Sequence, residues 1–500
     1  MVNTLPCFNN CDPKLTPLFS LSLNHRVTTI VGKEKVVLEK MKEEKSRDVG
    51  DVERLDAPNT RQRRGVGRKF WGAVFISLLL LHVFLRPVSY GMSGCMTGSS
   101  SEKNIERRVK YILKHTPLID GHNDLPIMLR WKFNNHINDK NFTTGWEDGT
   151  LPGHVDLARL RDGMNGGAFW SLFWPCPANG TDFSDENYLP AVEATLQQID
   201  LVDRLRAAYP KDFGPAVSSK GALKAWKHHN QLISPMGIEG LHQIGNSAAT
   251  LRRYHALGVR YATLVHNCGN KYADAALQEN PFRKAPSHWG GVSPAGEALV
   301  NEMNRIGMIV DLSHTSVETM KDVLGGTGKE WNGSRAPVIF SHSSAYALCP
   351  HPRNVPDDVL QLVKQRNSLV MVNFSPDFIS CVAAPERDDG LPDFDPENAT
   401  LEHVAEHIIH IGKLIGYDHV GLGSDFDGIP TVPKGLEDVS RYPDLVAELL
   451  RRGVSDADAS KIVGGNILRV WSDVERVAVE MQKVGEPALE DDLKDLMPEE

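Results

Sequence analysis

The sequence has little excess charge of either sign. It has no cysteine spacing typical of zinc fingers and no apolar run long enough to span a bilayer comfortably. The 500 residues carry a formal net charge of −9, which excludes a general nucleic-acid binder, since such proteins usually present a basic field. None of the seven cysteines forms a C-x-x-C pair. The C-terminal end is acidic, EDDLKDLMPEE, so we expect no lipid anchor there. With 41% hydrophobic residues, the rest can form one large domain or two smaller ones.

The N-terminal part differs in composition from the rest. Residues 1–69 are rich in charge with little apolar periodicity, and we interpret them as a mobile charged tail. The apolar stretch FWGAVFISLLLLHVFL follows at 70–85, short of the ~20 residues that span a bilayer comfortably. The basic cluster RQRRGVGRK precedes it. By the positive-inside tendency, we predict a signal anchor over 70–88, a cytoplasmic tail and a lumenal or extracellular main body. Cleavage of the segment would give a secreted protein instead.

Two further features suit a translocated chain. Four N-x-S/T sequons in polar, turn-like surroundings are predicted glycosylation sites: Asn141, Asn179, Asn332 and Asn398. A fifth, Asn373, lies in an apolar run and is expected to be buried. The main body holds four cysteines: Cys176, Cys268, Cys349 and Cys381. In an oxidising compartment these predict two disulfides, with three pairings open.

From about residue 105 onward, short apolar runs alternate with amphipathic helical stretches. The runs cover 116–124, 167–176, 234–240, 261–267, 308–314, 337–343, 368–375 and 419–428. Most are continuous rather than alternating, as in strands buried on both faces. Eight strand–helix repeats predict an α/β fold, a parallel TIM-like (β/α)8 barrel over 105–475. A doubly wound open sheet is the structural alternative. We interpret residues 476–500 as an acidic C-terminal tail.

Ionisable residues stand at the ends of six of these runs. They are His122 and Asp124, Glu239, His266, His314, His342 and Asp425. Taken singly, each is compatible with a capping or core hydrogen-bonding group. In a parallel barrel, however, the carboxyl ends of the strands meet on one face, where active sites of this fold lie. Convergence of the whole set therefore predicts a metal site at the barrel mouth.

The residue types indicate which metal chemistry this site performs. Imidazole and carboxylate without thiolate suit Zn²⁺ and other borderline divalent ions. Five ligands fit two ions if one carboxylate bridges them: His122, Asp124, Glu239, His314 and His342. Glu239 is the expected bridge, because its strand stands between the two ligand pairs. Such a site generates hydroxide at neutral pH and polarises a carbonyl, which predicts hydrolysis of an amide or ester.

Several longer motifs resemble the membrane (renal-type) dipeptidases, peptidase family M19 of the metal-dependent amidohydrolase superfamily. They are IDGHNDLP, IEG, HNC at 266–268, VDLSHTS, APVIFSHSSAY, RNVPDD and GSDFDG. The resemblance runs from about 105 to 475, and two loops look more like fungal members. It implies a metal-dependent hydrolase barrel and a dipeptidase with two Zn²⁺ per chain. His122 and Asp124 match the ligands of one ion, His314 and His342 those of the other, and Glu239 the bridge.

The resemblance also implies roles beyond the metal. Asp425 matches the acid that moves a proton from water to the leaving amine, and His266 a group that steadies the oxyanion. Arg353 matches a residue that receives the substrate's C-terminal carboxylate. Phe378 departs from the family pattern, where we expect Tyr.

The resemblance also has consequences for the cysteines and for assembly. The family's disulfides map as Cys176–Cys268 and Cys349–Cys381, and relatives form homodimers, so a homodimer is possible here. The leading hypothesis is a membrane-attached zinc dipeptidase acting on small dipeptides. The alternatives are another binuclear amidohydrolase, such as a deacetylase or lactamase, and a non-catalytic cell-surface relative.

Overall fold

The computed structural model describes residues 97–215 and 218–492. These belong to the second of the two units into which the chain divides, 94–500. The predicted tail over 1–69 and signal anchor over 70–88 lie outside the described residues. Within the described ranges, no helix has both the length and the apolar character that a membrane span requires.

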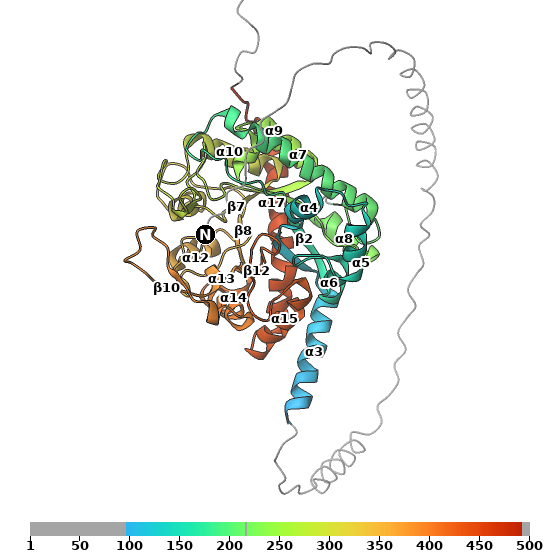
Figure 1. Cartoon of the computed structure of the whole chain (residues 1–500). Helices are drawn as coiled ribbons and strands as arrows, with labels where there is room; N and C mark the ends of the chain where they lie inside the picture. The colour runs from blue at the N-terminus through green and yellow to red at the C-terminus, as the bar shows by residue number, and fades with distance from the viewer. Residues whose placement is uncertain (1–96, 216–217, 493–500) are drawn as a thin grey trace, which may run out of the picture. The chain divides into compact units, whose positions relative to one another are not determined.

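Eight parallel strands form one sheet that curves into a nearly closed barrel (Figure 1). They are β1 (Leu118–Asn123), β2 (Asn165–Ser171), β3 (Met236–Glu239), β4 (Val259–Thr263), β7 (Ile309–Asp311), β8 (Ile339–Phe340), β9 (Leu369–Val372) and β12 (Val420–Leu422). Neighbours pair in chain order. The last strand returns to the first through a parallel bridge between Asn123 and Phe426. Each predicted run overlaps one strand, so the barrel is confirmed and the open sheet is wrong.

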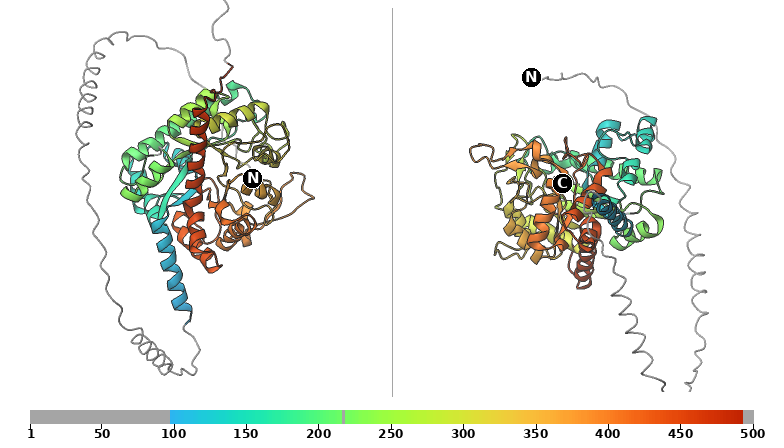
Figure 2. Two further views of the ribbon diagram at one scale, coloured as in Figure 1. Left: turned by 180° about the vertical axis from the view of Figure 1, so that it is seen from behind. Right: turned by 90° about the horizontal axis from the view of Figure 1, so that it is seen from below.

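Helices surround the barrel, as Figures 1 and 2 show. They are α3 (Thr97–His115), α4 (Leu125–Phe133), α5 (Lys140–Asp148), α6 (Leu157–Asp162), α7 (Asp185–Ala208), α8 (Ser219–His229), α9 (Ala248–Ala256), α10 (Pro294–Ile306), α11 (Val317–Val323), α12 (Asp357–Gln365), α13 (Pro376–Ile379), α14 (Leu401–Ile415), α15 (Tyr442–Arg451), α16 (Asp456–Ser460) and α17 (Asn466–Lys483). Two small hairpins project from the loops: β5 (Leu277–Gln278) with β6 (Arg283–Lys284), and β10 (Cys381–Val382) with β11 (Asp393–Phe394).

The barrel interior is filled with side chains rather than open. The strands contribute Ile119, Phe169, Tyr261, Ile309, Ile339, Leu369 and Met371 to one buried apolar cluster. Trp471 of α17 packs against Phe169, with ring centroids 5.7 Å apart, and the left view of Figure 2 shows α17 lying across the back of the barrel. Gly237 makes room for the Tyr261 ring, because a Cβ there would lie 2.1 Å from Cζ of Tyr261. Because the interior is filled, an active site is expected at the carboxyl ends of the strands.

The C-terminal segment is packed further than we expected. Helix α17 continues to Lys483, past the boundary that we placed at 475, because Val477 and Met481 face the core. Beyond the helix, the Leu489 N–H donates to Oε2 of the buried Glu302 at 3.1 Å. The Asp491 carboxylate accepts the Ala248 N–H at the start of α9 at 2.7 Å. The chain therefore follows the surface of the barrel at least to Asp492.

The surface and disulfide predictions have different outcomes. All four predicted glycosylation asparagines are exposed, as a glycan requires, and glycosylation stays a prediction. Asn373 is fully buried, as expected. Both disulfides implied by the resemblance are present, Cys176–Cys268 and Cys349–Cys381.

Candidate active site

The five predicted metal ligands converge at the carboxyl ends of the strands, and all five are buried. The Glu239 carboxylate lies at the centre. Its Oε2 is 3.6 Å from Nε2 of His122, and its Oε1 is 2.9 Å from Nε2 of His314 and 3.4 Å from Nε2 of His342. Asp124 completes the His122 side, with its Oδ2 3.0 Å from the imidazole Nε2. The two Glu239 oxygens thus face two different groups of donors, as expected of a bridging carboxylate.

Two residues of the site lie in an unusual backbone conformation. His314 follows β7 with φ of 66°, and Asp425 follows β12 with φ of 67°. This left-handed region is uncommon for residues other than glycine. It persists where surrounding structure enforces it, and such positions cluster at functional sites. The turn redirects each side chain toward the barrel mouth at the point where its strand ends.

The three histidines are oriented by partners on their outer nitrogens. Nδ1 of His122 lies 2.9 Å from Oη of Tyr261, Nδ1 of His314 lies 2.9 Å from Oδ1 of Asn267, and Nδ1 of His342 lies 2.8 Å from Oγ of Ser341. Ser341 donates its own hydroxyl hydrogen to Asp311, so it accepts from His342. With hydrogen on Nδ1, each ring presents the Nε2 lone pair to the cluster. Metal-binding histidines are held in this way by outer partners.

Burial also favours the neutral form of two of these rings. Burial, together with the positive charge of Arg353, holds the pKa values of His314 and His342 well below the usual range. Neutral imidazole is the form that binds metal ions. The two Nε2 atoms are 3.0 Å apart, and two facing lone pairs repel unless a proton or a cation lies between them.

The carboxylates require positive charge. Asp124, Glu239 and Asp425 are all buried, yet among the described residues no Lys or Arg forms an ion pair with any of them. Burial, with Asp124 and Glu239 nearby, raises the pKa of Asp425 to about 8. Oδ1 of Asp124 is buried without a hydrogen-bond partner in the described part of the chain. Buried charges need a partner or a metal ion, so this donor set fits a centre of divalent cations.

Groups of three donors with mutually close ligand atoms occur on both sides of Glu239. They are His122, Glu239 and His342; Glu239, His266 and His314; and His122, Asp124 and Asp425. Oδ1 of Asp425 lies 4.0 Å from Nε2 of His122, and its Oδ2 accepts from Nδ2 of Asn373 at 3.1 Å. All the predicted site carboxylates and imidazoles therefore belong to one cluster.

Arg353 is buried against this cluster with unused hydrogen-bonding capacity. Among the residues that the structure describes, its Nη2 donates only a long bond of 3.4 Å to the His342 carbonyl, and its Nε has no partner. Among the described residues, no carboxylate forms an ion pair with it, and burial lowers its pKa to about 10. The guanidinium lies over the Phe378 ring, 5.0 Å from the centroid. A buried guanidinium with free donors is suited to receive an anionic group of a ligand.

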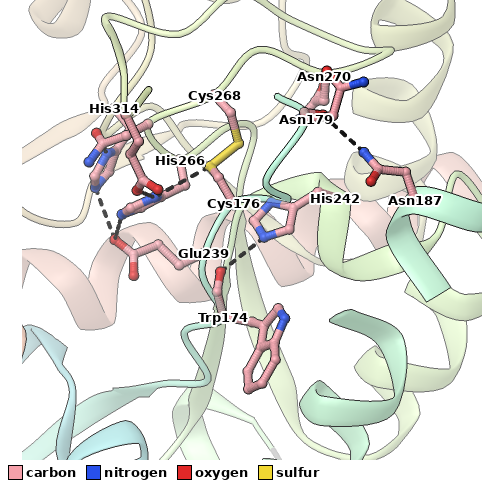
Figure 3. The surroundings of a disulfide bond; sticks show 12 residues. Trp174, Cys176, Asn179, Asn187, Glu239, His242, His266, Cys268, Asn270 and His314 are labelled. Atoms are coloured by element: carbon pink, nitrogen blue, oxygen red, sulfur yellow. Dashed lines mark hydrogen bonds and ion pairs between the residues drawn. A yellow bond between two sulfur atoms is a disulfide. The ribbon is translucent and has the colours of Figure 1, made fainter. Parts of the chain in front are cut away.

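A cavity of about 280 Å³ opens onto these groups. Its lining comprises Asp124, Ile127, Trp131, Phe173, Glu239, His266, Asn267, His314, Arg353, Ser375, Phe378, Asp425, Gly428 and Ile429. His266 is one of these lining residues, and Figure 3 shows its ring beside the Cys176–Cys268 disulfide. The predicted catalytic and substrate residues and three of the five predicted metal ligands therefore line one cavity of small-molecule size, and His122 and His342 do not line it.

Several contributing residues were not predicted from the sequence. Tyr261, Asn267 and Ser341 hold the outer nitrogens of the histidines, and Asn373 binds Asp425. Asn267 and Ser341 are sequence neighbours of predicted residues, which is a signal that could have identified them. Nothing local marks Tyr261, since its contact with His122 spans 139 residues.

Comparison with known proteins gives a consistent picture. Residues 106–485 match the family described as membrane dipeptidase, peptidase family M19. Dipeptidase aclJ of Aspergillus oryzae is 48% identical over 392 residues, which cover 77% of this chain and 84% of that protein. An uncharacterised dipeptidase of Schizosaccharomyces pombe is 48% identical over 390 residues, which cover 77% and 87%. The resemblance read from the motifs is confirmed.

Solved structures are similar as well. A metallopeptidase of Rhodobacter sphaeroides, bound to a phosphinate mimic of the dipeptide L-Ala-D-Ala, matches with a TM-score of 0.60 at 26% identity, covering 72% of this chain and 99% of that one. The probable dipeptidase PvdM of Pseudomonas aeruginosa matches with a TM-score of 0.63 at 24% identity, covering 75% and 100%. The latter similarity supports the fold alone.

The hydroxyl of Tyr261 provides a test of the metal centre. We expect Tyr261→Phe to weaken divalent metal binding about 10- to 100-fold, because loss of an outer partner of a metal-binding histidine has this effect. Competition with a chromogenic chelator measures the affinity. The matched control is Tyr254→Phe, which removes a buried hydroxyl bonded to the Gln243 carbonyl instead. Equal metal affinity in both variants would contradict the role given to Tyr261.

Proposed function

Because this chain belongs to the membrane dipeptidase family, peptidase family M19, we propose that it is a zinc-dependent hydrolase of dipeptides with a free C-terminal carboxylate. Membership makes it a metal-dependent dipeptidase. The observation that carries the finer proposal is the Glu239 carboxylate, with imidazole Nε2 atoms facing both of its oxygens. An unpaired buried guanidinium, Arg353, lies beside it.

The metal ligands divide into two sets about Glu239. His122 and Asp124 would hold one Zn²⁺, and His314 and His342 the other, with Glu239 shared between them. When bound, two such ions supply a hydroxide at neutral pH and polarise the scissile carbonyl. The rest of the reaction depends on groups of the chain itself.

Asp425 is the group to which we assign proton transfer. Its buried carboxylate is 4.0 Å from Nε2 of His122, and Asn373 orients it through Oδ2. We assign it as the general base that takes a proton from the attacking water and the acid that delivers it to the leaving amine. A carboxylate that is held in place in this way can accept a proton from water and return it to the amine.

His266 and Arg353 act on the substrate directly in this proposal. The His266 ring stands beside His314, with centroids 4.3 Å apart, and donates to the oxyanion of the tetrahedral intermediate. Arg353 receives the C-terminal carboxylate through its free N–H groups. A carboxylate bound at a set distance from the scissile carbonyl selects a dipeptide over a longer chain.

The cavity has an apolar end opposite Arg353. Phe173 follows β2, and Arg353 follows β8, which stands across the ring in the strand order. Trp131 of α4 packs edge-on against Phe173, with centroids 6.4 Å apart, and Ile127 and Ile429 line the same cavity. With the carboxylate at Arg353, the N-terminal residue lies toward this end. We therefore propose a preference for an apolar N-terminal side chain.

The compartment is a separate proposal. Two disulfides and four exposed sequons support a lumenal or extracellular main body, since disulfides persist in oxidising compartments. A membrane anchor over 70–88 and a homodimer stay predictions. N-terminal sequencing of the mature protein distinguishes a retained segment from a cleaved one.

Metal content tests the cofactor. We expect the purified full-length protein to hold about two zinc ions per chain by elemental analysis, to lose dipeptidase activity with a chelator and to regain it with Zn²⁺. Glu239→Gln should lower the zinc content, because it removes the shared anionic ligand. The control His410→Gln changes a half-buried histidine of α14 outside the cluster and should keep both ions. One ion or fewer in the parent protein would overturn the two-ion proposal.

Substrate anchoring tests Arg353. Arg353→Met removes the charge with little change of volume, and we expect the KM for a dipeptide to rise about 100-fold, as loss of charge-assisted hydrogen bonds of ~3 kcal/mol implies. The matched substrate is the same dipeptide with an amidated C-terminus, on which the parent and the variant should perform equally poorly. An unchanged KM would favour a deacetylase or lactamase.

Side-chain preference tests the apolar end. We expect Trp131→Ala to raise the KM for Leu-Ala about tenfold, because removing contacts with a buried apolar side chain loses about 1–2 kcal/mol, and to leave Gly-Ala nearly unchanged. Trp131 is 61% exposed, so the variant should fold. Gly-Ala is the control because it has the same C-terminal residue as Leu-Ala. An equal rise in KM for both substrates would contradict the placement of the N-terminal side chain near Trp131.

A further inference from the structure

We propose that Glu279, on the loop between β4 and α10, is a positioning residue for His266. Its Oε1 lies 3.3 Å from Nδ1 of the His266 ring, while Oε1 of Glu239 lies 4.0 Å from Nε2 on the other side. The imidazole therefore stands between two carboxylates, one belonging to the metal cluster and one outside it. The inference rests on the proposed role of His266.

The His266 ring is closely packed, and apart from Glu279 no oxygen acceptor of the described ranges contacts its Nδ1. Phe173 packs against it with centroids 4.9 Å apart, and the Cys176–Cys268 disulfide lies alongside, with Sγ of Cys176 3.7 Å from Nδ1. Figure 3 shows the disulfide beside the His266 ring. Sulfur is a weak acceptor. Among the described residues, Glu279 is the only carboxylate within ion-pair distance of Nδ1.

The backbone beside Glu279 is held by contacts on several sides. It directly follows β5 of the β5–β6 hairpin, in which Leu277 pairs with Lys284. At the base of the hairpin, the Ala276 N–H donates to the carbonyl of His314 at 2.7 Å, and Leu277 packs with Leu391 in a small buried cluster. The carboxylate is 31% exposed, but its backbone is tied to the strand end that carries a metal ligand.

A third metal site is the rival explanation for this group. Cys176, His266 and Glu279 do have mutually close donor atoms. Metal ions bind the thiolate form of cysteine, however, and Cys176 is in a disulfide with Cys268. Two ligands alone do not make a closed site. The geometry instead matches a carboxylate that orients a catalytic imidazole.

This orientation has a direct consequence for the reaction. The contact between Nδ1 and Glu279 fixes the plane of the His266 ring, so that Nε2 on its opposite side is directed toward the cavity, where the oxyanion develops. A group that orients a donor for the transition state changes turnover more than ground-state binding. Glu279 thus acts through His266 and does not touch the substrate.

The test compares Glu279→Gln, Glu279→Asp and the control Asp388→Asn, which neutralises an exposed acid of the neighbouring loop. For Glu279→Gln we expect kcat to fall about 10- to 100-fold, as for other outer partners of catalytic groups, with KM within twofold and zinc content unchanged. The inhibition constant of a phosphinate dipeptide mimic should rise by the same factor as kcat falls. Glu279→Asp should retain more activity than Glu279→Gln, and the control should match the parent.

A double variant makes the outcome decisive. If Glu279 acts through His266, then adding Glu279→Gln to His266→Gln should not lower kcat further. The effects of two substitutions are not additive when one residue acts through the other. An additional loss in the double variant would overturn the inference, as would normal kcat in Glu279→Gln. An inactive parent protein would instead count against the proposed dipeptidase, which separates the two failures.

Discussion

The site depends on one carboxylate that is surrounded by imidazoles. Glu239 ends β3, and its two oxygens face His122 on one side and His314 and His342 on the other. Its backbone N–H donates to Oε1 of Gln243 at 2.8 Å, which fixes the end of the strand. Four strands must therefore reach the same height around a closed ring, which a nearly closed barrel achieves and an open sheet does not.

The apolar core sets that height. The Tyr261 ring fills the space that Gly237 leaves open, and its hydroxyl reaches Nδ1 of His122 at the top of the interior. Trp471 occupies the opposite end against Phe169. A close-packed interior transmits small shifts, because it contains few voids to absorb them. A change in the packing below the site is therefore expected to change the positions of the side chains that form it.

A second layer of polar contacts gives each functional group its direction. Asn267 and Ser341 hold two imidazoles, Asn373 holds Asp425, and Glu279 faces His266. Asn267 and Asn373 come from other parts of the chain than the groups they hold, whereas Ser341 directly precedes His342 and Glu279 lies in the same connection between β4 and α10 as His266. They are also what distinguishes an arranged cluster of donors from a mere concentration of buried charge.

Much of this could be predicted from the sequence, for identifiable reasons. Continuous apolar runs separated by helical stretches indicate buried parallel strands, and a polar residue just after such a run must lie at the barrel mouth. His122, Glu239 and Asp425 follow from this rule alone. The rule fails for Tyr261, which lies within a run, and for Glu279, which lies in a long loop with no periodic pattern.

The sequence by itself determined the order of strands, the residue types at their ends and, through longer motifs, the family. Only the tertiary structure decided which oxygen of Glu239 faces which imidazole and which nitrogen of each ring is free. It also revealed that Arg353 has unpaired donors and that Glu279 reaches His266. The physical reason is the distance along the chain over which each property is determined. Periodicity and strand ends are local properties of the chain, whereas hydrogen-bond direction and burial arise between segments that are brought together only when the barrel closes.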